Sequence, residues 1–114
     1  MKRVILGLTQ EISVMGSLGK EYTVIARIDT GATASSIDAV LAEKWGLGPV
    51  MKTKIIKSAS GVRSRPVVKV KIKLHSLLLE EYFNLADRAH MTYQVLLGQN
   101  ILKKGNFLID PRRV

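Results

Sequence analysis

The triplet Asp29-Thr30-Gly31 has the residue types of a paired-carboxylate active site. Two carboxyl groups about 3 Å apart cannot both ionise, so one stays protonated while the other takes a proton from a bound water. Such a pair hydrolyses a peptide bond without a covalent intermediate, because the acid hydrogen-bonds the scissile carbonyl while the base activates the water. Thr30 can lock the loop to a partner chain, and Gly31 permits a sharp turn. Since the triplet occurs once, two chains are needed to build one site.

A strand and a later apolar run are expected to position this triplet. Over residues 21–28, apolar side chains occupy every second position, which predicts a β-strand that ends at the triplet. The run Val95-Leu96-Leu97 before Gly98 predicts a short buried strand, followed by a helical turn over 99–104 and a closing strand over 106–110.

The rest of the pattern is also mostly that of strands. The aliphatic residues are mainly Val, Ile and Leu, which favours sheet. A short helix is expected over 36–45, where apolar residues recur at spacings of three and four. Further strands are expected over 3–8, 11–14, 52–57, 65–74 and 77–86. Small residues at 58–62 suit the tip of a basic hairpin. The prediction is an all-β single domain over 1–114 with one or two short helices.

Charge and missing residue types narrow the classes of function. Eighteen Lys and Arg against nine Asp and Glu give a net charge of +9. This charge has three interpretations, namely a solvated sheet face, attraction of an acidic substrate, or RNA binding. The chain has no cysteine and therefore no disulfide framework. Its first apolar stretch is too short for a signal peptide or a membrane span, so we expect a soluble, cytoplasmic protein without a membrane partner.

These features occur in an order that resembles a known family. The chain is similar to the retropepsin-like aspartic proteases often labelled "ATP-dependent zinc protease", which include the protease partner of the ATP-grasp ligase that adds glutamates to a ribosomal protein. The stretches that carry the resemblance are residues 27–36 (RIDTGATASS), 58–61 (SASG), 65–68 (RPVV), 96–102 (LLGQNIL) and 107–111 (FLIDP). They span nearly the whole chain.

The resemblance implies a closed retropepsin-like β-barrel with a flap hairpin over 57–66. It implies that Asp29 is the catalytic carboxylate and that Thr30 and Gly31 lock the loop. Substrate-binding positions implied by it are Ala32, Ser58, Ala59, Ser60, Gly61, Arg63 and Arg65. It further implies a homodimer that acts on a peptide or protein substrate, with acidic tails suited to the flap arginines, and a functional link to an ATP-grasp ligase. Many members have Arg where this chain has Gln99, so an ion pair that steadies the loop is absent or replaced.

Zinc and ATP, which the family label claims, have no recognisable motif in this sequence. Only His75 and His90 are present, there is no Cys, and no Gly-rich phosphate loop follows a strand. We therefore predict no cofactor and no metal.

Several other polar and aromatic residues have simpler roles. We expect His75 and His90 to lie on the surface, and Trp45 to anchor the helix to the core. Local backbone bonds or helix caps are expected for Thr33, Ser35 and Ser36. The alternative to a peptidase is a non-catalytic basic module that binds acidic protein tails or RNA.

Overall fold

A computed structural model describes residues 3–59 and 61–113, without the side chains of Ile56 and Ser58. The strands are β1 (Val4–Leu6), β2 (Thr9–Met15), β3 (Glu21–Ile28), β4 (Ser35–Asp38), β5 (Val50–Ser58), β6 (Gly61–Leu74), β7 (Leu77–Ala86), β8 (Val95–Leu97) and β9 (Phe107–Ile109). The helices are α1 (Ala39–Lys44) and α2 (Gln99–Leu102), with a 3-10 turn at Ser17–Gly19. The expected mostly-β chain with two short helices is confirmed.

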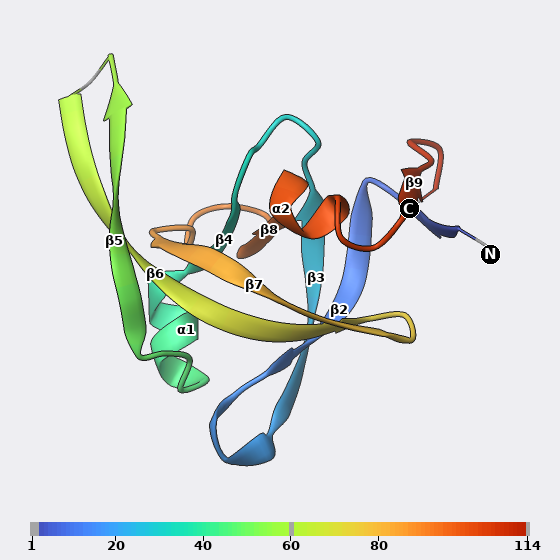
Figure 1. Ribbon diagram of the computed structural model, residues 1–114, viewed down its shortest axis with the longest axis horizontal. Helices are drawn as coiled ribbons and strands as arrows, with labels where there is room; N and C mark the ends of the chain where they lie inside the picture. The colour runs from blue at the N-terminus through green and yellow to red at the C-terminus, as the bar shows by residue number, and fades with distance from the viewer. Residues whose placement is uncertain (1–2, 60, 114) are drawn as a thin grey trace.

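The main sheet closes on itself as a barrel. Its strand order is β2-β3-β8-β4-β7-β6-β5, and an additional pairing joins β2 to β6. Strand β5 therefore lies outside the closed ring and pairs with β6 alone (Figure 1). Inside the ring, β8 runs parallel to β3 and antiparallel to β4. This arrangement brings the carboxyl ends of β3 and β8 to the same end of the barrel.

Buried apolar side chains and exposed polar side chains alternate along the strands. In β6, the side chains of Val68, Val70, Ile72 and Leu74 are buried, whereas the lysines between them are exposed. Two of these lysines pair with carboxylates, Lys69 with Glu80 at 3.6 Å and Lys73 with Glu21 at 3.1 Å. The alternate lysines thus form a solvated sheet face.

The expected helix over 36–45 is wrong at its start. Residues Ser35–Asp38 form β4, because Ile37 pairs with Val95 on one side and with Leu85 on the other. The helix begins only at Ala39, where Asp38 Oδ2 accepts the Leu41 amide at 3.2 Å as an N-cap.

Trp45 anchors the end of α1 to the barrel, as expected. Its indole is 8% exposed and stacks on the Tyr22 ring, with the ring centroids 4.9 Å apart. The contact fixes α1 against β3 at the end of the barrel away from the Asp-Thr-Gly loop (Figure 1).

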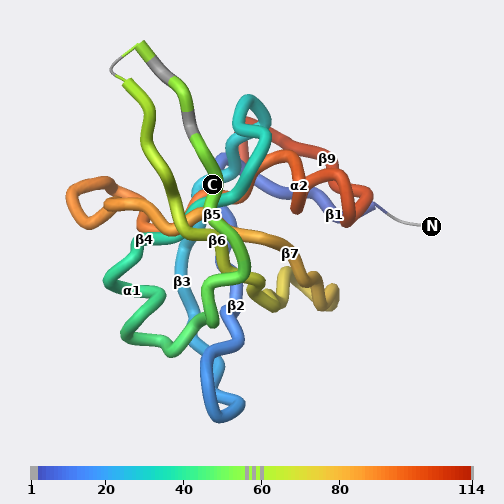
Figure 2. Tube along the Cα trace, turned by 60° about the vertical axis from the view of Figure 1, so that its left-hand side comes forward, coloured from blue at the N-terminus to red at the C-terminus, as the bar shows by residue number. Residues whose placement is uncertain are grey.

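The two ends of the chain meet in a separate pair of strands. β1 runs parallel to β9, with Ile5 opposite Leu108, and Figure 2 shows the two strands together at one side of the molecule. The closing strand that the sequence predicted is thereby confirmed. Within the described residues no helix is long and apolar enough to span a membrane.

Candidate active site

The Asp29 carboxylate is oriented by its own loop. The Asp29 amide donates to the Leu97 carbonyl at 3.0 Å, which ties the end of β3 to the end of β8. The Gly31 amide donates to Asp29 Oδ1 at 3.0 Å, and the Ala32 amide donates to the Asp29 carbonyl at 3.3 Å. Asp29 remains half-exposed, and its second carboxylate oxygen makes no hydrogen bond to the described part of the chain. One oxygen is therefore held and the other is available to a water or a second carboxyl group.

Residues after β8 support this loop from beneath. The Gln99 amide donates to the Ala32 carbonyl, and Gln99 Nε2 donates to the Thr30 carbonyl, both at 2.8 Å. Gly98 packs against the Ala34 carbonyl so closely that a Cβ would overlap with it. Gln99 thus steadies the Asp29 loop with a neutral hydrogen bond.

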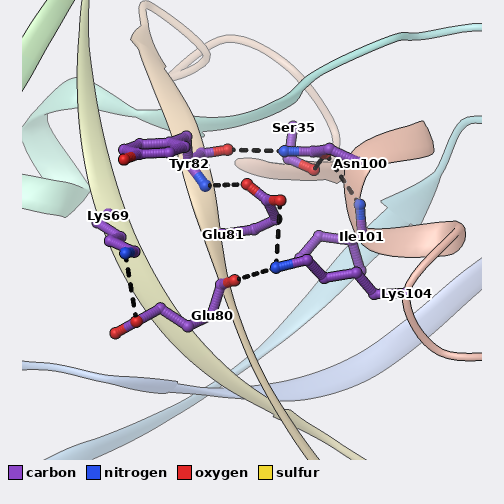
Figure 3. A network of polar contacts seen from close by, with 8 residues as sticks. All are labelled: Ser35, Lys69, Glu80, Glu81, Tyr82, Asn100, Ile101 and Lys104. Atoms are coloured by element: carbon purple, nitrogen blue, oxygen red, sulfur yellow. Dashed lines mark hydrogen bonds and ion pairs between the residues drawn. The ribbon is translucent and has the colours of Figure 1, made fainter.

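A buried polar network continues from the loop into the barrel (Figure 3). Ser35 is fully buried; its hydroxyl accepts the Gly98 amide at 3.0 Å and donates to Asn100 Oδ1 at 2.7 Å. Asn100 Nδ2 in turn donates to the Tyr82 carbonyl at 2.9 Å. The expectation of a local or capping role for Ser35 is wrong. Its partners lie more than sixty residues away, so no local sequence pattern indicates them.

An ion pair between Glu81 and Lys104, the Glu81–Lys104 anchor, lies below this network. Glu81 on β7 lies 3.3 Å from Lys104 Nζ and accepts the Tyr82 amide at 2.7 Å (Figure 3). Burial acts to raise the pKa of Glu81, but the hydrogen bonds from Tyr82 and Lys104 outweigh it and hold that pKa below its usual value. The charged pair helps to fix β7 beneath α2.

An open groove joins the loop to the β5–β6 hairpin. It has a volume of about 430 Å³, and its lining includes Gly31, Ala32, Lys54 and Arg65. An adjoining cleft of about 530 Å³ extends it along β5 and β7. Its lining residues are Thr33, Ala34, Lys52, Thr53, Lys54, Ile55, Val67, Glu81, Tyr82, Asn84 and Asn100. The structure therefore places a continuous trough between the Asp29 loop and the hairpin.

The predicted site residues fall into two groups. The trough brings Gly31, Ala32 and Arg65 together beside Asp29 and Thr30. Ala59, Gly61 and Arg63 are exposed on the outer hairpin and line neither cleft. The Ser58 side chain and the whole of Ser60 lie outside the described residues.

Comparison with known proteins identifies the protein family. A model of the RimB-like family, described as retropepsin-like aspartic endopeptidase RimB, matches residues 46–114. The chain belongs to this family. It is accordingly an aspartic-type peptidase, and the family assignment was predicted from the sequence. The match begins after the Asp-Thr-Gly loop and does not include Asp29.

Solved structures agree on the fold. A protein of unknown function from Legionella pneumophila is 24% identical, with 97% of this chain and 95% of that chain covered and a TM-score of 0.69. The EIAV protease, solved with an inhibitor, is 18% identical over 84% and 85% of the two chains, with a TM-score of 0.66. The simian foamy virus protease is 19% identical over 83% and 91%, with a TM-score of 0.63. No curated protein sequence matches the chain. These likenesses confirm the retropepsin-like barrel of this RimB-like protein.

Metal donors do not gather among the described residues of this RimB-like chain. In the part that the structure describes, no three His, Cys, Asp or Glu side chains come together in a set that could hold a metal ion. His75 and His90 are both exposed, as expected. The donor set of the described residues therefore does not fit zinc.

Proposed function

We propose that this RimB-like protein is an aspartic endopeptidase in which Asp29 is the catalytic carboxylate and a second copy of the chain supplies the other half of the dyad. The observation that carries the proposal is the Asp29 loop, where Oδ1 accepts the Gly31 amide at 3.0 Å and Oδ2 is left for the reaction. One chain contributes one such carboxylate, whereas the chemistry needs two that share a proton. Thr30 is exposed at the same loop and is placed to contact the second copy.

The proposed reaction follows from a dyad with one proton. The ionised Asp29 takes a proton from water as the water oxygen attacks the carbonyl carbon, while the protonated Asp29 of the second copy hydrogen-bonds the carbonyl oxygen. Collapse of the tetrahedral intermediate breaks the C–N bond, and a proton passes from the dyad to the leaving nitrogen. The carboxyl groups end with one shared proton, as they began. In this chain, Gln99 and Gly31 hold the loop so that the carboxylate needs little reorganisation.

The trough between the loop and the hairpin is the proposed substrate channel. Ala32 and Arg65 line it beside Gly31, so an extended peptide in the trough would pass within reach of the carboxylate. We propose that Ser58, Ala59, Ser60, Gly61 and Arg63 act as the flap, which must approach the substrate because Ala59, Gly61 and Arg63 are exposed away from both clefts. Acidic substrates, a cytoplasmic location and a functional link to an ATP-grasp ligase are parts of the same proposal, supported by the net charge of +9, the lack of cysteine and the family resemblance.

The experiment that tests the proposal compares the wild type with Asp29→Asn on a glutamate-tailed peptide and a neutral peptide pool, with products read by mass spectrometry. We expect cleavage by the wild type and a loss of about 10²- to 10⁴-fold in rate for the variant, since it removes the acid–base group. Sedimentation of both proteins should show a dimer. Cleavage retained by Asp29→Asn would refute the assignment. A folded wild type that binds polyanions but cleaves neither substrate would favour the basic binding module.

The flap arginines permit a narrower test of acidic-substrate preference. Arg63→Glu with Arg65→Glu should slow cleavage of the glutamate-tailed peptide more than that of neutral peptides. An equal change in both rates would remove the flap charge as the source of that preference.

A further inference from the structure

A further cleft lies between β3, β8 and the loop 87–94, on residues to which no role has so far been assigned. Its volume is about 430 Å³, and Arg27, Arg88, His90, Tyr93 and Leu96 are among its lining residues. Three of these side chains are basic types. None of the five lines the trough beneath the hairpin.

This cleft opens on the face of β3 that leads to the catalytic loop. Ala26 and Ile28 are buried in the core, so Arg27 between them projects to the other face. Asp29 follows Arg27 by two residues, a separation of about 7 Å along an extended strand. Leu96 is the register partner of Arg27 on β8 and forms an apolar wall of the cleft. A group bound at Arg27 would therefore lie beside the scissile bond.

Positive charge around the cleft exceeds the negative charge that could neutralise it. Burial, followed by repulsion from Arg27 and Arg65, holds the pKa of Arg88 below its usual value, against the opposite pull of Asp29 and Asp38. Asp38 is already occupied, because its two oxygens accept the Leu41 and Arg88 amides. Arg27, Arg65 and Arg88 make no ion pair within 4.0 Å in the part of the chain that is described.

Arg88 is held in place for binding. Its backbone amide donates to Asp38 Oδ1 at 2.9 Å, and its Nε donates to the Tyr93 carbonyl at 3.1 Å. These bonds fix the guanidinium plane and leave the terminal nitrogens as donors, none of them bonded to another described residue. A planar, partly buried guanidinium with free donors is suited to a carboxylate, which accepts two parallel hydrogen bonds.

We propose that this cleft binds a substrate carboxylate next to the scissile bond, and that Arg27 and Arg88 determine the specificity of the peptidase. The inference rests on the proposed function, which places the scissile bond at Asp29. A carboxylate can come from an acidic side chain within the substrate or from the free carboxyl end of a chain. In either case the apolar wall at Leu96 contacts the methylene groups, and the charged end reaches the two guanidinium groups.

The test uses Arg27→Gln, since the Arg27 side chain is exposed and makes no hydrogen bond or ion pair with the described residues, so its loss should leave the fold intact. Two peptide pairs are compared by kcat/KM, one with Glu or Gln beside the cleaved bond and one with a free or amidated carboxyl end. We expect wild type to prefer the carboxylate in one pair, and Arg27→Gln to reduce that preference about tenfold or more. The pair that responds identifies the source of the carboxylate. Unchanged ratios in both pairs would overturn the inference.

Two further variants separate charge at the cleft from charge in general. Lys20→Gln removes one positive charge from the exposed turn at the other end of β3 and should leave both ratios at the wild-type value. Arg27→Lys keeps the charge and should restore part of the preference. If Lys20→Gln reduced the ratio as much as Arg27→Gln, the effect would be one of net charge and the cleft would have no part in it.

A binding measurement keeps this inference distinct from the proposed function. Asp29→Asn protein, alone and combined with Arg27→Gln, is titrated with the Glu and Gln peptides by calorimetry. The Arg27 change should weaken binding of the carboxylate peptide about tenfold or more and that of the neutral peptide little, whether or not the wild type cleaves. Equal binding by both proteins would refute the carboxylate site even in an active peptidase. Cleavage that survives Asp29→Asn would refute only the catalytic proposal.

Discussion

The Asp29 loop and the outer β5–β6 hairpin face each other across the trough but are held by different interactions. The loop is bonded to residues far away in sequence, with Gln99 on the Thr30 and Ala32 carbonyls and Ser35 on the Gly98 amide. The outer part of the hairpin, residues 53–58 and 61–66, is held by its own β5–β6 ladder, and its described residues at 53–55 and 61–64 are exposed. One region is fixed by the whole fold and the other by local pairing.

This difference matches what a peptidase needs from each region. Acid–base chemistry requires a carboxylate in one position, because misplacement of the reacting groups raises the barrier. A cover over the substrate must open and close, and segments with few buried apolar contacts open at low free-energy cost. Figure 2 shows the hairpin projecting beyond the body of the barrel, while the loop is set against α2.

The largest effect is expected from a change that disturbs the Asp29 loop, the more rigid of the two regions. In Gly98→Ala, the new methyl group would overlap with the Ala34 carbonyl, which is backbone and cannot rotate away. We expect a loss of about 1–3 kcal/mol in the free energy of unfolding, measured with denaturant, together with loss of cleavage. Met51→Ala, on an exposed residue of β5 that lines neither cleft, is the control in the hairpin. It should change the free energy of unfolding by less than about 0.5 kcal/mol and leave cleavage in place. A cost at Met51 equal to that at Gly98 would remove the contrast between the two regions.

The next largest effect is expected from Asn100→Ala. It leaves the buried Ser35 hydroxyl without its acceptor and the Tyr82 carbonyl without its donor. The expected cost is about 1–3 kcal/mol, measured by thermal or denaturant unfolding. Lys103→Ala, on an exposed neighbouring residue, should change stability by less than about 0.5 kcal/mol. A stable Asn100→Ala protein would show that the network does not support the loop.

Gln99→Ala is expected to disturb the Asp29 loop more than the stability of the whole fold. Removal of the side-chain bond to the Thr30 carbonyl should cost about 0.5–1.5 kcal/mol in stability. Because that carbonyl lies within the proposed catalytic triplet, kcat should fall by more than the small change in folded population explains. Gln99→Arg retains a donor and should keep more activity than Gln99→Ala. Identical kinetics for both variants would mean that the bond is dispensable.

The smallest expected effect is on the acid sensitivity of the Glu81–Lys104 anchor. The folded pKa of Glu81 lies below its unfolded value, so its stabilisation is present above the unfolded pKa and is lost as pH falls through the folded value. Glu81→Gln should therefore destabilise the protein slightly near neutral pH and reduce the loss of stability on acidification. Unfolding midpoints from neutral pH to below pH 4 test this. A variant with the same acid dependence as wild type would contradict the assigned role.

Patterns within single strands were predictable from the sequence. Alternation over 21–28 located β3, and the apolar run at 95–97 located β8. The helix predicted over 36–45 was wrong at residues 36–38, where the helical spacing of apolar residues competed with strand pairing to β7 and β8. The pairing partners come from distant segments, so the local pattern did not show that a strand would be favoured.

The sequence by itself determined the family, the mostly-β composition and the presence of one Asp-Thr-Gly triplet, because these depend on residue type and short spacing. Only the tertiary structure decided that Gln99 supports Thr30 and that Ser35 bonds Asn100. It also decided that Arg27 and Arg88 line one cleft. The physical reason is that these contacts are made across a closed sheet, where strand register and barrel closure bring together residues that no local period relates.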